Sequence, residues 1–283
     1  MLKAMMKRLR FIFVLIILAV AAAVFVLSQQ PAGWLEVDFL DVGQGDSILI
    51  KAPQGQTVLI DGGPDQQVLA ELAHYLPWWD KEIDLMILTH PHADHVTGLN
   101  YVLENYQVSQ VMATGVSHTS ANYLNWLATI KEKKIPLTIV DSPRQVVLGD
   151  CQLNIIWPRE NLLNKTVDNL NNTSIVSQLN CGQTVWLLTG DLESDGEAAL
   201  LASGLNLKAQ VLKVGHHGSL TANSLAWLEA IQPDWAIISA GKDNSYGLPK
   251  QTIIERLENL GATVWRTDQQ GSLQLSTDGQ LIW

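Results

Sequence analysis

The strongest constraint on this chain is an apolar segment that ends in a turn rich in histidine. Residues 83–89, IDLMILT, form a nearly continuous apolar run, which is typical of a strand buried on both faces. Pro91 follows and cannot extend a strand ladder, so we expect the chain to turn there. A strand covered on both faces needs a layer on either side. The segment therefore predicts a layered α/β protein with polar chemistry at one strand end.

Strand and helix patterns alternate along the chain from residue 34 to the C-terminus, and this part is long enough for one large domain, 34–283. Alternating or β-branched runs predict strands, whereas apolar residues three or four positions apart predict helices. We expect strands at 34–40, 47–52, 57–61, 83–89, 110–114, 137–140, 151–157, 174–180, 184–191, 209–214, 234–240, 263–267 and 272–283, and helices at 68–75, 96–105, 121–134, 195–203, 224–231 and 250–261. The pattern does not predict the order of the strands.

The N-terminus has a different composition, because residues 11–27 carry no charged or polar side chain and only basic charges precede them. As a helix this run is ~25 Å long, and flanking side chains can absorb the mismatch to a ~30 Å hydrocarbon core. We therefore expect residues 1–30 to be a single-pass membrane anchor, crossing at 11–27, with the N-terminus cytoplasmic and the large domain extracellular or periplasmic. The alternative is a signal peptide cleaved within 19–23, which would leave a secreted domain. Residues 29–33 are expected to form a linker.

Charge is divided unevenly between these two parts. The 283 residues carry a net −10, to which residues 1–30 contribute four basic and no acidic side chains. The remainder holds 14 basic and 28 acidic side chains, a net −14. Because long nucleic acids are bound through basic surfaces, this balance works against them as partners.

Five of the seven histidines fall into two short clusters, 90–95 and 216–217. Neutral imidazole is the commonest metal ligand in proteins. In the first cluster, the spacing lets His90 and His92 face one metal ion while Asp94 and His95 face a second. The sequence therefore predicts a metal centre at the end of the strand 83–89.

This H-x-H-x-D-H motif resembles that of the metallo-β-lactamase superfamily of binuclear metal hydrolases, and further motifs match in the expected order. They are Asp61-Gly62-Gly63, Thr189-Gly190-Asp191 and Gly215-His216-His217-Gly218-Ser219, each at the end of a predicted strand. The resemblance implies a four-layer αββα sandwich that follows the transmembrane helix and holds two divalent metal ions, zinc or alternatively manganese. It further implies that Asp191 bridges the ions and that one histidine of the second cluster is a ligand. We favour His217 as that ligand and His216 as a substrate contact, which makes Asp94, Asp191 and His216 the expected catalytic residues.

A narrower resemblance is to the hydrolase domain of ComEC-type competence proteins, which belong to bacterial DNA uptake. It is carried by FLDVGQGDSILI at 39–50, NNTSIV at 171–176, LKVGHHGS at 212–219, and the later segments YGLP at 246–249 and WRTDQQGS at 265–272. Two positions depart from what the resemblance implies. No histidine other than His118 lies between the first cluster and Asp191, although many members place a third ligand for the first metal there. Leu248 stands where these proteins usually have histidine.

The remaining candidate residues are expected to support the centre rather than to form it. Asp61 is expected to accept hydrogen bonds near the metals, and Asn172, Ser174 and Ser219 to contact substrate or ligands, whereas His74 and His118 are expected at the surface. Cys151 begins one predicted strand and Cys181 ends another. If these strands pair antiparallel, the two cysteines lie close enough for a disulfide.

Together these features predict a metal-dependent hydrolase of a phosphoester or phosphodiester, acting on short or single-stranded nucleic acid or another phosphoester-containing substrate. One alternative is a β-lactamase or thiolester hydrolase. Another is a non-catalytic, metal-stabilised binding module related to DNA uptake. The sequence does not distinguish zinc from manganese and does not predict the oligomeric state.

Overall fold

The computed structural model describes residues 2–28 and 33–283, so most of the expected linker at 29–33 lies outside the described residues. Helix α1 spans Leu2–Ser28, and the unit Gly33–Trp283 is separate and compact. Within these described ranges, no helix is long and apolar enough to cross a lipid bilayer. The expected single-pass localisation, with a crossing at 11–27, is therefore wrong. Helix α1 has 27 residues, but its uninterrupted apolar run spans only ~25 Å, less than a ~30 Å hydrocarbon core, and the flanking side chains do not compensate for the difference as expected.

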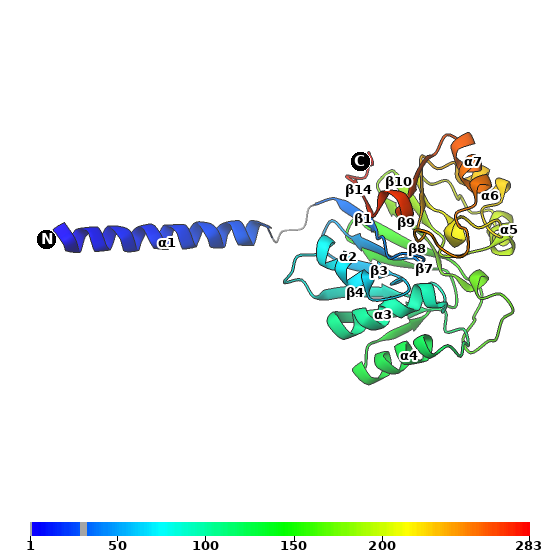
Figure 1. Cartoon of the computed structure of the whole chain (residues 1–283), viewed down its shortest axis with the longest axis horizontal. Coiled ribbons are helices and arrows are strands. Elements are labelled where there is room, and N and C mark those ends of the chain that lie inside the picture. Colours follow the sequence, from blue (N-terminus) through cyan, green and yellow to red (C-terminus); the bar gives the residue numbers. More distant parts are fainter. Residues whose placement is uncertain (1, 29–32) are drawn as a thin grey trace. The chain divides into compact units, whose positions relative to one another are not determined.

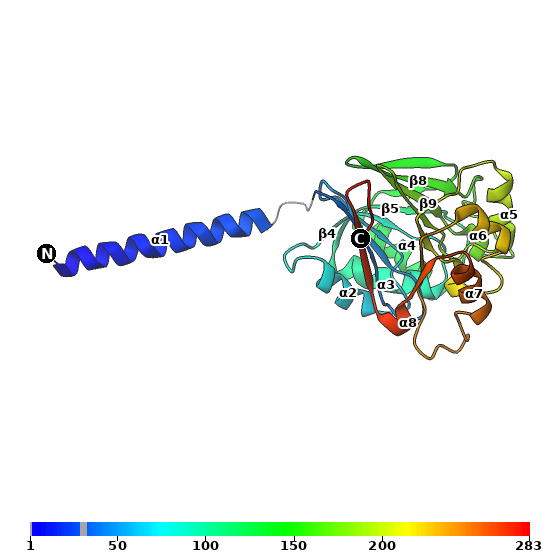
Figure 2. The ribbon, with the colours of Figure 1, turned by 90° about the horizontal axis from the view of Figure 1, so that it is seen from above.

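The first sheet of the large unit is mixed, with strand order β14-β1-β2-β3-β4-β5-β6. Pairing is antiparallel from β14 to β3 and parallel from β3 to β6. Figure 2 shows the C-terminal strand β14 (red) beside β1 (blue), where it forms the edge of the sheet. The strands are β1 Leu35–Phe39, β2 Ile48–Lys51, β3 Thr57–Ile60, β4 Glu82–Ile87, β5 Gln107–Ala113, β6 Leu137–Ile139 and β14 Leu273–Thr277, and the helices packed on them are α2 Gln67–Tyr75, α3 Ala93–Asn105 and α4 Ala121–Lys133.

The second sheet repeats this plan, with order β13-β12-β11-β10-β9-β8-β7. Pairing is antiparallel from β7 to β10 and parallel from β10 to β13. The strands are β7 Arg144–Leu148, β8 Cys151–Trp157, β9 Val176–Cys181, β10 Thr184–Leu188, β11 Val211–Lys213, β12 Trp235–Ile238 and β13 Thr263–Arg266. The helices are α5 Ser194–Ala202, α6 Leu225–Ile231, α7 Gln251–Asn259 and α8 Thr267–Gln270, with two short 3₁₀ turns at Asn171–Thr173 and Gly215–Gly218.

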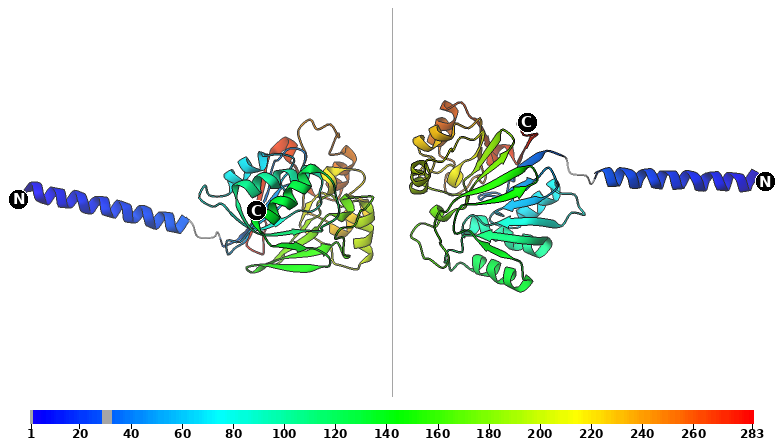
Figure 3. Two further views of the ribbon diagram at one scale, coloured as in Figure 1. Left: turned by 90° about the horizontal axis from the view of Figure 1, so that it is seen from below. Right: turned by 180° about the vertical axis from the view of Figure 1, so that it is seen from behind.

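Three hydrophobic clusters divide the unit into four layers. One cluster lies between the sheets, and each of the others joins a sheet to its own helices. Neighbouring side chains on one strand point to different clusters: Ile48 and Ile50 face the middle, whereas Leu49 faces α2 and α3. Figures 1 and 3 show the cyan and green helices α2–α4 outside one sheet and the yellow and orange helices α5–α7 outside the other. The expected α/β class, with two sheets and helices around them, is confirmed.

The disulfide that the sequence left open is present, because the two predicted strands do pair antiparallel. Cys151 and Cys181 lie directly opposite each other in the antiparallel β8–β9 ladder, with Cα atoms 4.4 Å apart. The opposite ends of the two strands are joined by residues 158–175, which carry Asn172 and Ser174. The disulfide therefore lies at the end of the second sheet that is remote from these residues.

Candidate metal centre

The first histidine cluster lies where the chain passes from β4 to α3. The strand ends at Ile87, and His92 adopts an extended conformation as the N-cap of α3, which begins at Ala93. Asp94 then lies in the first turn of the helix, where a negative charge complements the helix dipole. This short strand–turn–helix passage brings the rings of His90 and His92 to a centroid distance of 4.7 Å and those of His90 and His95 to 4.2 Å.

Four side chains from both halves of the unit meet at one point. The Nε2 atom of His95 lies 3.2 Å from Oδ2 of Asp191 and 3.9 Å from Oδ2 of Asp94. The Nε2 atom of His217 lies 3.3 Å from Oδ2 of Asp94 and 3.4 Å from Oδ2 of Asp191. Ligand atoms ~2.1 Å from a tetrahedral ion are themselves ~3.4 Å apart. The four atoms lie within 4.8 Å of one another, and the four distances above, 3.2–3.9 Å, are compatible with a tetrahedral metal site.

Unsatisfied atoms in this cluster also fit a metal. His217 Nε2 and Asp191 Oδ1 are buried, and neither makes a hydrogen bond of acceptable geometry within the described residues. Buried polar atoms without partners are costly and uncommon in native proteins. A divalent cation would satisfy both atoms, so the donor set fits the ion that the sequence motif predicts.

The neighbouring pair of histidines is less complete as a site. His90 Nε2 lies 3.0 Å from His92 Nδ1 and 4.0 Å from Asp191 Oδ2. Ser174 Oγ lies 3.4 Å from the opposite ring nitrogen of His90, and it accepts a hydrogen bond from the Asp191 backbone N–H. The ring of His118, expected at the surface, is partly buried, 6.3 Å from that of His92. A metal ion beside His90 and His92 would therefore have these two histidines as candidate ligands, together with Asp191, which also belongs to the four-atom site.

Burial and nearby charges shift the pKa values of the histidines in this cluster. Burial lowers the pKa of His90 well below its usual value, and the neighbouring His95 adds to the effect, which keeps the imidazole neutral as a ligand must be. Burial alone would lower the pKa of His95 too, but the carboxylates of Asp191, Asp61 and Asp94 hold it well above the usual value. His217 behaves in the same way beside Asp191 and Asp46. Metal binding at the four-atom site would therefore displace protons from these two rings.

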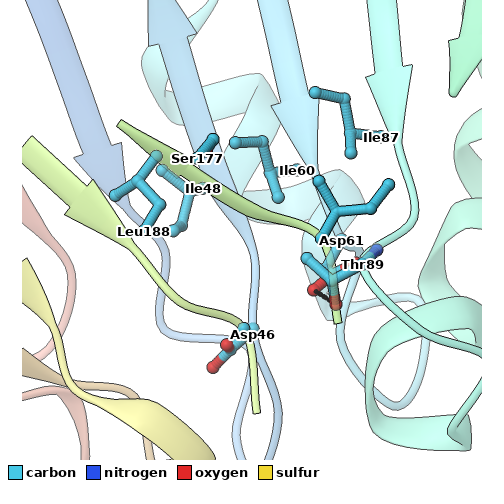
Figure 4. Close-up of a pocket in the computed structure, with 10 residues that line it drawn as sticks. Asp46, Ile48, Ile60, Asp61, Ile87, Thr89, Ser177 and Leu188 are labelled. Atoms are coloured by element: carbon cyan, nitrogen blue, oxygen red, sulfur yellow. Dashed lines mark hydrogen bonds between the residues drawn. The ribbon is translucent and has the colours of Figure 1, made fainter. Parts of the chain in front are cut away.

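Buried groups behind the ligands orient them. Asp61 Oδ2 lies 2.8 Å from His95 Nδ1, and both Asp61 oxygens accept hydrogen bonds from Thr89, one from its N–H and one from its hydroxyl. Figure 4 shows this Asp61–Thr89 pair beside a small enclosed cavity between the sheets, with Asp46 at the same end. On the other side, His217 Nδ1 donates to the Ser239 carbonyl at 2.9 Å. His95 and His217 thus present Nε2 to the centre because their other ring nitrogens are engaged.

An open pocket of about 350 Å³ lies over the centre, and the candidate ligands Asp94, Asp191 and His217 are part of its lining. His216 lies in its wall, with Nδ1 3.0 Å from Glu193 Oε1 and 3.0 Å from Thr221 Oγ1. Tyr246 and Leu248 also line the pocket. Leu248 therefore stands at the pocket, in the position where the sequence resemblance implies histidine.

The residues expected to contact substrate are not all at this pocket. Asn172 accepts a hydrogen bond from the Glu193 N–H through its Oδ1, so this atom supports the loop after β10. Ser219 Oγ bonds Thr221 and lies within the second histidine turn. Ser174 lies beneath Asp191, as its hydrogen bond to the Asp191 N–H shows. These three side chains support the loops that carry the candidate ligands.

Sequence reasoning missed two charged residues at the site. Glu193 follows Asp191 by two positions, and nothing in its spacing distinguishes it from an ordinary surface acid. Lys213 is fully buried in β11, with Nζ 2.6 Å from Asp46 Oδ2. A lysine within the apolar run VLKV was a visible signal, because a charge is almost never fully buried unless it is paired.

Comparison with known proteins agrees with this geometry. A family model described as the metallo-beta-lactamase superfamily matches residues 40–242. The chain belongs to this superfamily. The large unit therefore has the metal-dependent hydrolase fold of this superfamily, which implies divalent-metal binding, and the candidate ligands lie where its two sheets end.

Relatives of this metallo-β-lactamase domain include competence proteins of ComEC type. ComE operon protein 3 of Bacillus subtilis (strain 168) is 32% identical over 261 residues, which cover 84% of this chain and 32% of that protein. Recombination protein 2 of Haemophilus influenzae (strain ATCC 51907 / DSM 11121 / KW20 / Rd) is 30% identical over 273 residues, 95% of this chain and 32% of that protein. The chain thus spans about a third of the length of the curated relatives it matches.

Solved structures share the fold at low sequence identity. The metallo-beta-lactamase fold protein YhfI from Bacillus subtilis matches with a TM-score of 0.56 at 11% identity, covering 85% of this chain and 99% of that one. CmlA, a diiron beta-hydroxylase from Streptomyces venezuelae, matches with a TM-score of 0.56 at 14% identity, covering 86% and 54%. At these identities the likeness concerns the fold alone.

Proposed function

We propose that the chain is a binuclear metal-dependent phosphoesterase that acts on phosphodiesters, with short or single-stranded nucleic acid as the favoured substrate class. The observation that carries this proposal is the convergence of His95, His217, Asp94 and Asp191 at tetrahedral spacing, with His90 and His92 beside them. Two divalent ions in such a site supply a water of lowered pKa and polarise a phosphoryl oxygen.

The residues of the chain have separate roles in this proposal. Asp191 Oδ2 faces both ligand sets, at 3.2 Å from His95 and 4.0 Å from His90, so it is the group that can bridge two ions and orient the attacking water. His216 stands in the pocket wall and is held there by Glu193 and Thr221. From that position it would contact the leaving-group oxygen of a bound phosphoester.

The choice of substrate rests on the competence relatives and on the net negative charge of the large unit, which limits how long a nucleic acid can bind. Those relatives favour nucleic acid, but the acidic balance of residues 31–283 disfavours a long polyanion. A short or single-stranded piece presents fewer phosphates and fits an open pocket of about 350 Å³ better than a duplex. A β-lactam or thiolester substrate has no specific contact in the site to favour it.

Metal content and turnover of the full chain test this function. We expect two equivalents of zinc or manganese, and hydrolysis of bis-p-nitrophenyl phosphate and single-stranded DNA but not of nitrocefin. Bound metal without any turnover would instead identify a metal-stabilised binding module. Full activity of an Asp191→Ala variant would show that the site has been assigned wrongly.

A further inference from the structure

A buried ion pair joins the two halves of the unit directly beneath the metal centre. Lys213 and Asp46 both have almost no solvent exposure, and Lys213 Nζ lies 2.6 Å from Asp46 Oδ2. Lys213 ends β11 of the second sheet, and Asp46 lies in the loop between β1 and β2 of the first. Lys213 also donates to the carbonyl of Val214 at 3.0 Å. The ammonium group is therefore oriented by two acceptors and does not reach the substrate pocket.

Asp46 contacts a candidate ligand loop from each half. Its backbone N–H donates to the Asp94 carbonyl at 3.3 Å, and its carbonyl accepts from Gly63. Its other carboxylate oxygen, Oδ1, lies 3.3 Å from Nδ1 of His217. A Cβ atom at the preceding residue, Gly45, would collide with the Asp94 carbonyl, so the loop approaches Asp94 as closely as glycine allows. Asp46 thus links the turn of Asp94 to the ring of His217.

The turn that carries His217 needs such a restraint. His216 and His217 both have positive φ, 46° and 52°, in a region that non-glycine residues rarely occupy. Such a conformation persists only where the surroundings over-determine it. Lys213 precedes this turn by two residues, and its pairing with Asp46 attaches the end of β11 to the opposite sheet.

We propose that Lys213 and Asp46 are a positioning pair that aims His217 Nε2 at the metal and sets the affinity of the four-ligand site. This proposal rests on the binuclear site proposed above. The Nδ1–H of His217 donates to the Ser239 carbonyl, and the Asp46 carboxylate places a negative charge 3.3 Å from the same nitrogen, which makes Nε2 a stronger ligand. Lys213 engages Oδ2 and so keeps Asp46 in this supporting position rather than free to turn toward the metals.

The first sheet contains a matched pair that serves as a control. Lys51 Nζ lies 3.1 Å from Oδ2 of the fully buried Asp38, and also 2.7 Å from Glu36. This Lys–Asp pair joins β1 and β2 and contacts none of the candidate ligands. Disrupting it should alter stability as a buried pair does, without altering metal binding.

The test separates metal affinity from stability in the full chain. Native protein, Lys213→Met, Asp46→Asn, the double variant and the control Asp38→Asn are titrated with Zn²⁺ against a chromophoric chelator, and each is melted thermally. We expect Lys213→Met to weaken one of the two zinc equivalents ten- to a hundredfold. The double variant should melt above Lys213→Met, because no buried charge is left unpaired, and yet remain weakened for zinc. Asp38→Asn should change only the melting temperature.

The outcomes distinguish this proposal from the proposed function. Native protein that binds two zinc ions, together with a Lys213→Met variant of native affinity, overturns the positioning pair alone. A double variant that regains native zinc affinity along with stability also overturns it, because the pair would then be merely structural. Native protein that binds fewer than two ions overturns both the binuclear site and the positioning pair.

Discussion

Replacing Asp61 by asparagine tests how far a group that does not touch the metal controls the site. All three polar contacts of this side chain are donors: the Thr89 N–H at 2.8 Å, the Thr89 hydroxyl at 2.6 Å and His95 Nδ1 at 2.8 Å. A carboxylate accepts all three, whereas an amide has one oxygen and turns its NH₂ group toward a donor. The variant must therefore lose a contact or invert the His95 ring tautomer.

Inversion of the tautomer would place the proton on His95 Nε2, the atom that lies 3.2 Å from Asp191. Loss of such a supporting group typically costs ten- to a hundredfold in metal affinity or activity, which is about 1.4–2.7 kcal/mol. The backbone should not contribute, because Asp61 has φ of 59° and asparagine tolerates this region as well as aspartate does. We therefore expect Asp61→Asn to fold and to bind at least one metal ion ten- to a hundredfold more weakly.

The assay is chelator competition for the zinc dissociation constants, followed by kcat/KM on bis-p-nitrophenyl phosphate. Asp65→Asn is the matched control, since the exposed Asp65 side chain caps the start of α2 through the Gln67 N–H and contacts no ligand. A folded Asp61→Asn variant with both quantities within twofold of native would refute the role assigned to Asp61.

Three further predictions follow from individual groups. Burial raises the pKa of Asp38 to about 6, above its usual value of 3.8, so the charged carboxylate destabilises the folded state above pH 6. This penalty is relieved as the pH falls toward 3.8. The difference in unfolding free energy between Asp38→Asn and the native protein should therefore shift by about 2 kcal/mol in favour of the variant when the pH is raised from 4.5 to 8. Urea titrations that give the same pH dependence for both proteins would contradict this. Replacing Cys151 and Cys181, 30 residues apart, by alanine should cost about 3.6 kcal/mol without changing metal stoichiometry, and a loss of bound metal would count against the remote position of the disulfide. His216→Ala should lower kcat at least tenfold for an alkyl phosphodiester but less than threefold for bis-p-nitrophenyl phosphate, whose leaving group needs little assistance; equal losses would argue against a leaving-group contact.

The local parts of this protein were predictable from the sequence. The apolar run before His90 is the strand β4, and the expected helix at 121–134 is α4, Ala121–Lys133. These elements were recognised because their side-chain periodicity records burial directly. The strand β7, Arg144–Leu148, was not predicted, because it lies at a sheet edge and several of its side chains remain exposed.

The long-range parts were predictable only where a motif supplied them. Asp191 and His217 were assigned to the centre through the family resemblance, since no local pattern relates them to residues 90–95. The pairing of Lys213 with Asp46 had no such help, although the buried lysine was visible as an anomaly in its strand. The membrane crossing was predicted wrongly because flanking side chains were expected to compensate for an apolar run shorter than the hydrocarbon core.

The division of the ligands between two sheets has a consequence for how the protein acquires its metal. His95 precedes Asp191 by 96 residues, so a growing chain exposes the first histidine turn well before its partners are made. At that stage the turn can hold an ion only through adjacent side chains, and such an ion exchanges readily with its surroundings. The four-ligand site forms when the second sheet closes on the first. We therefore expect the ion that the mature protein retains to be selected at that closure, from the metals present where folding is completed.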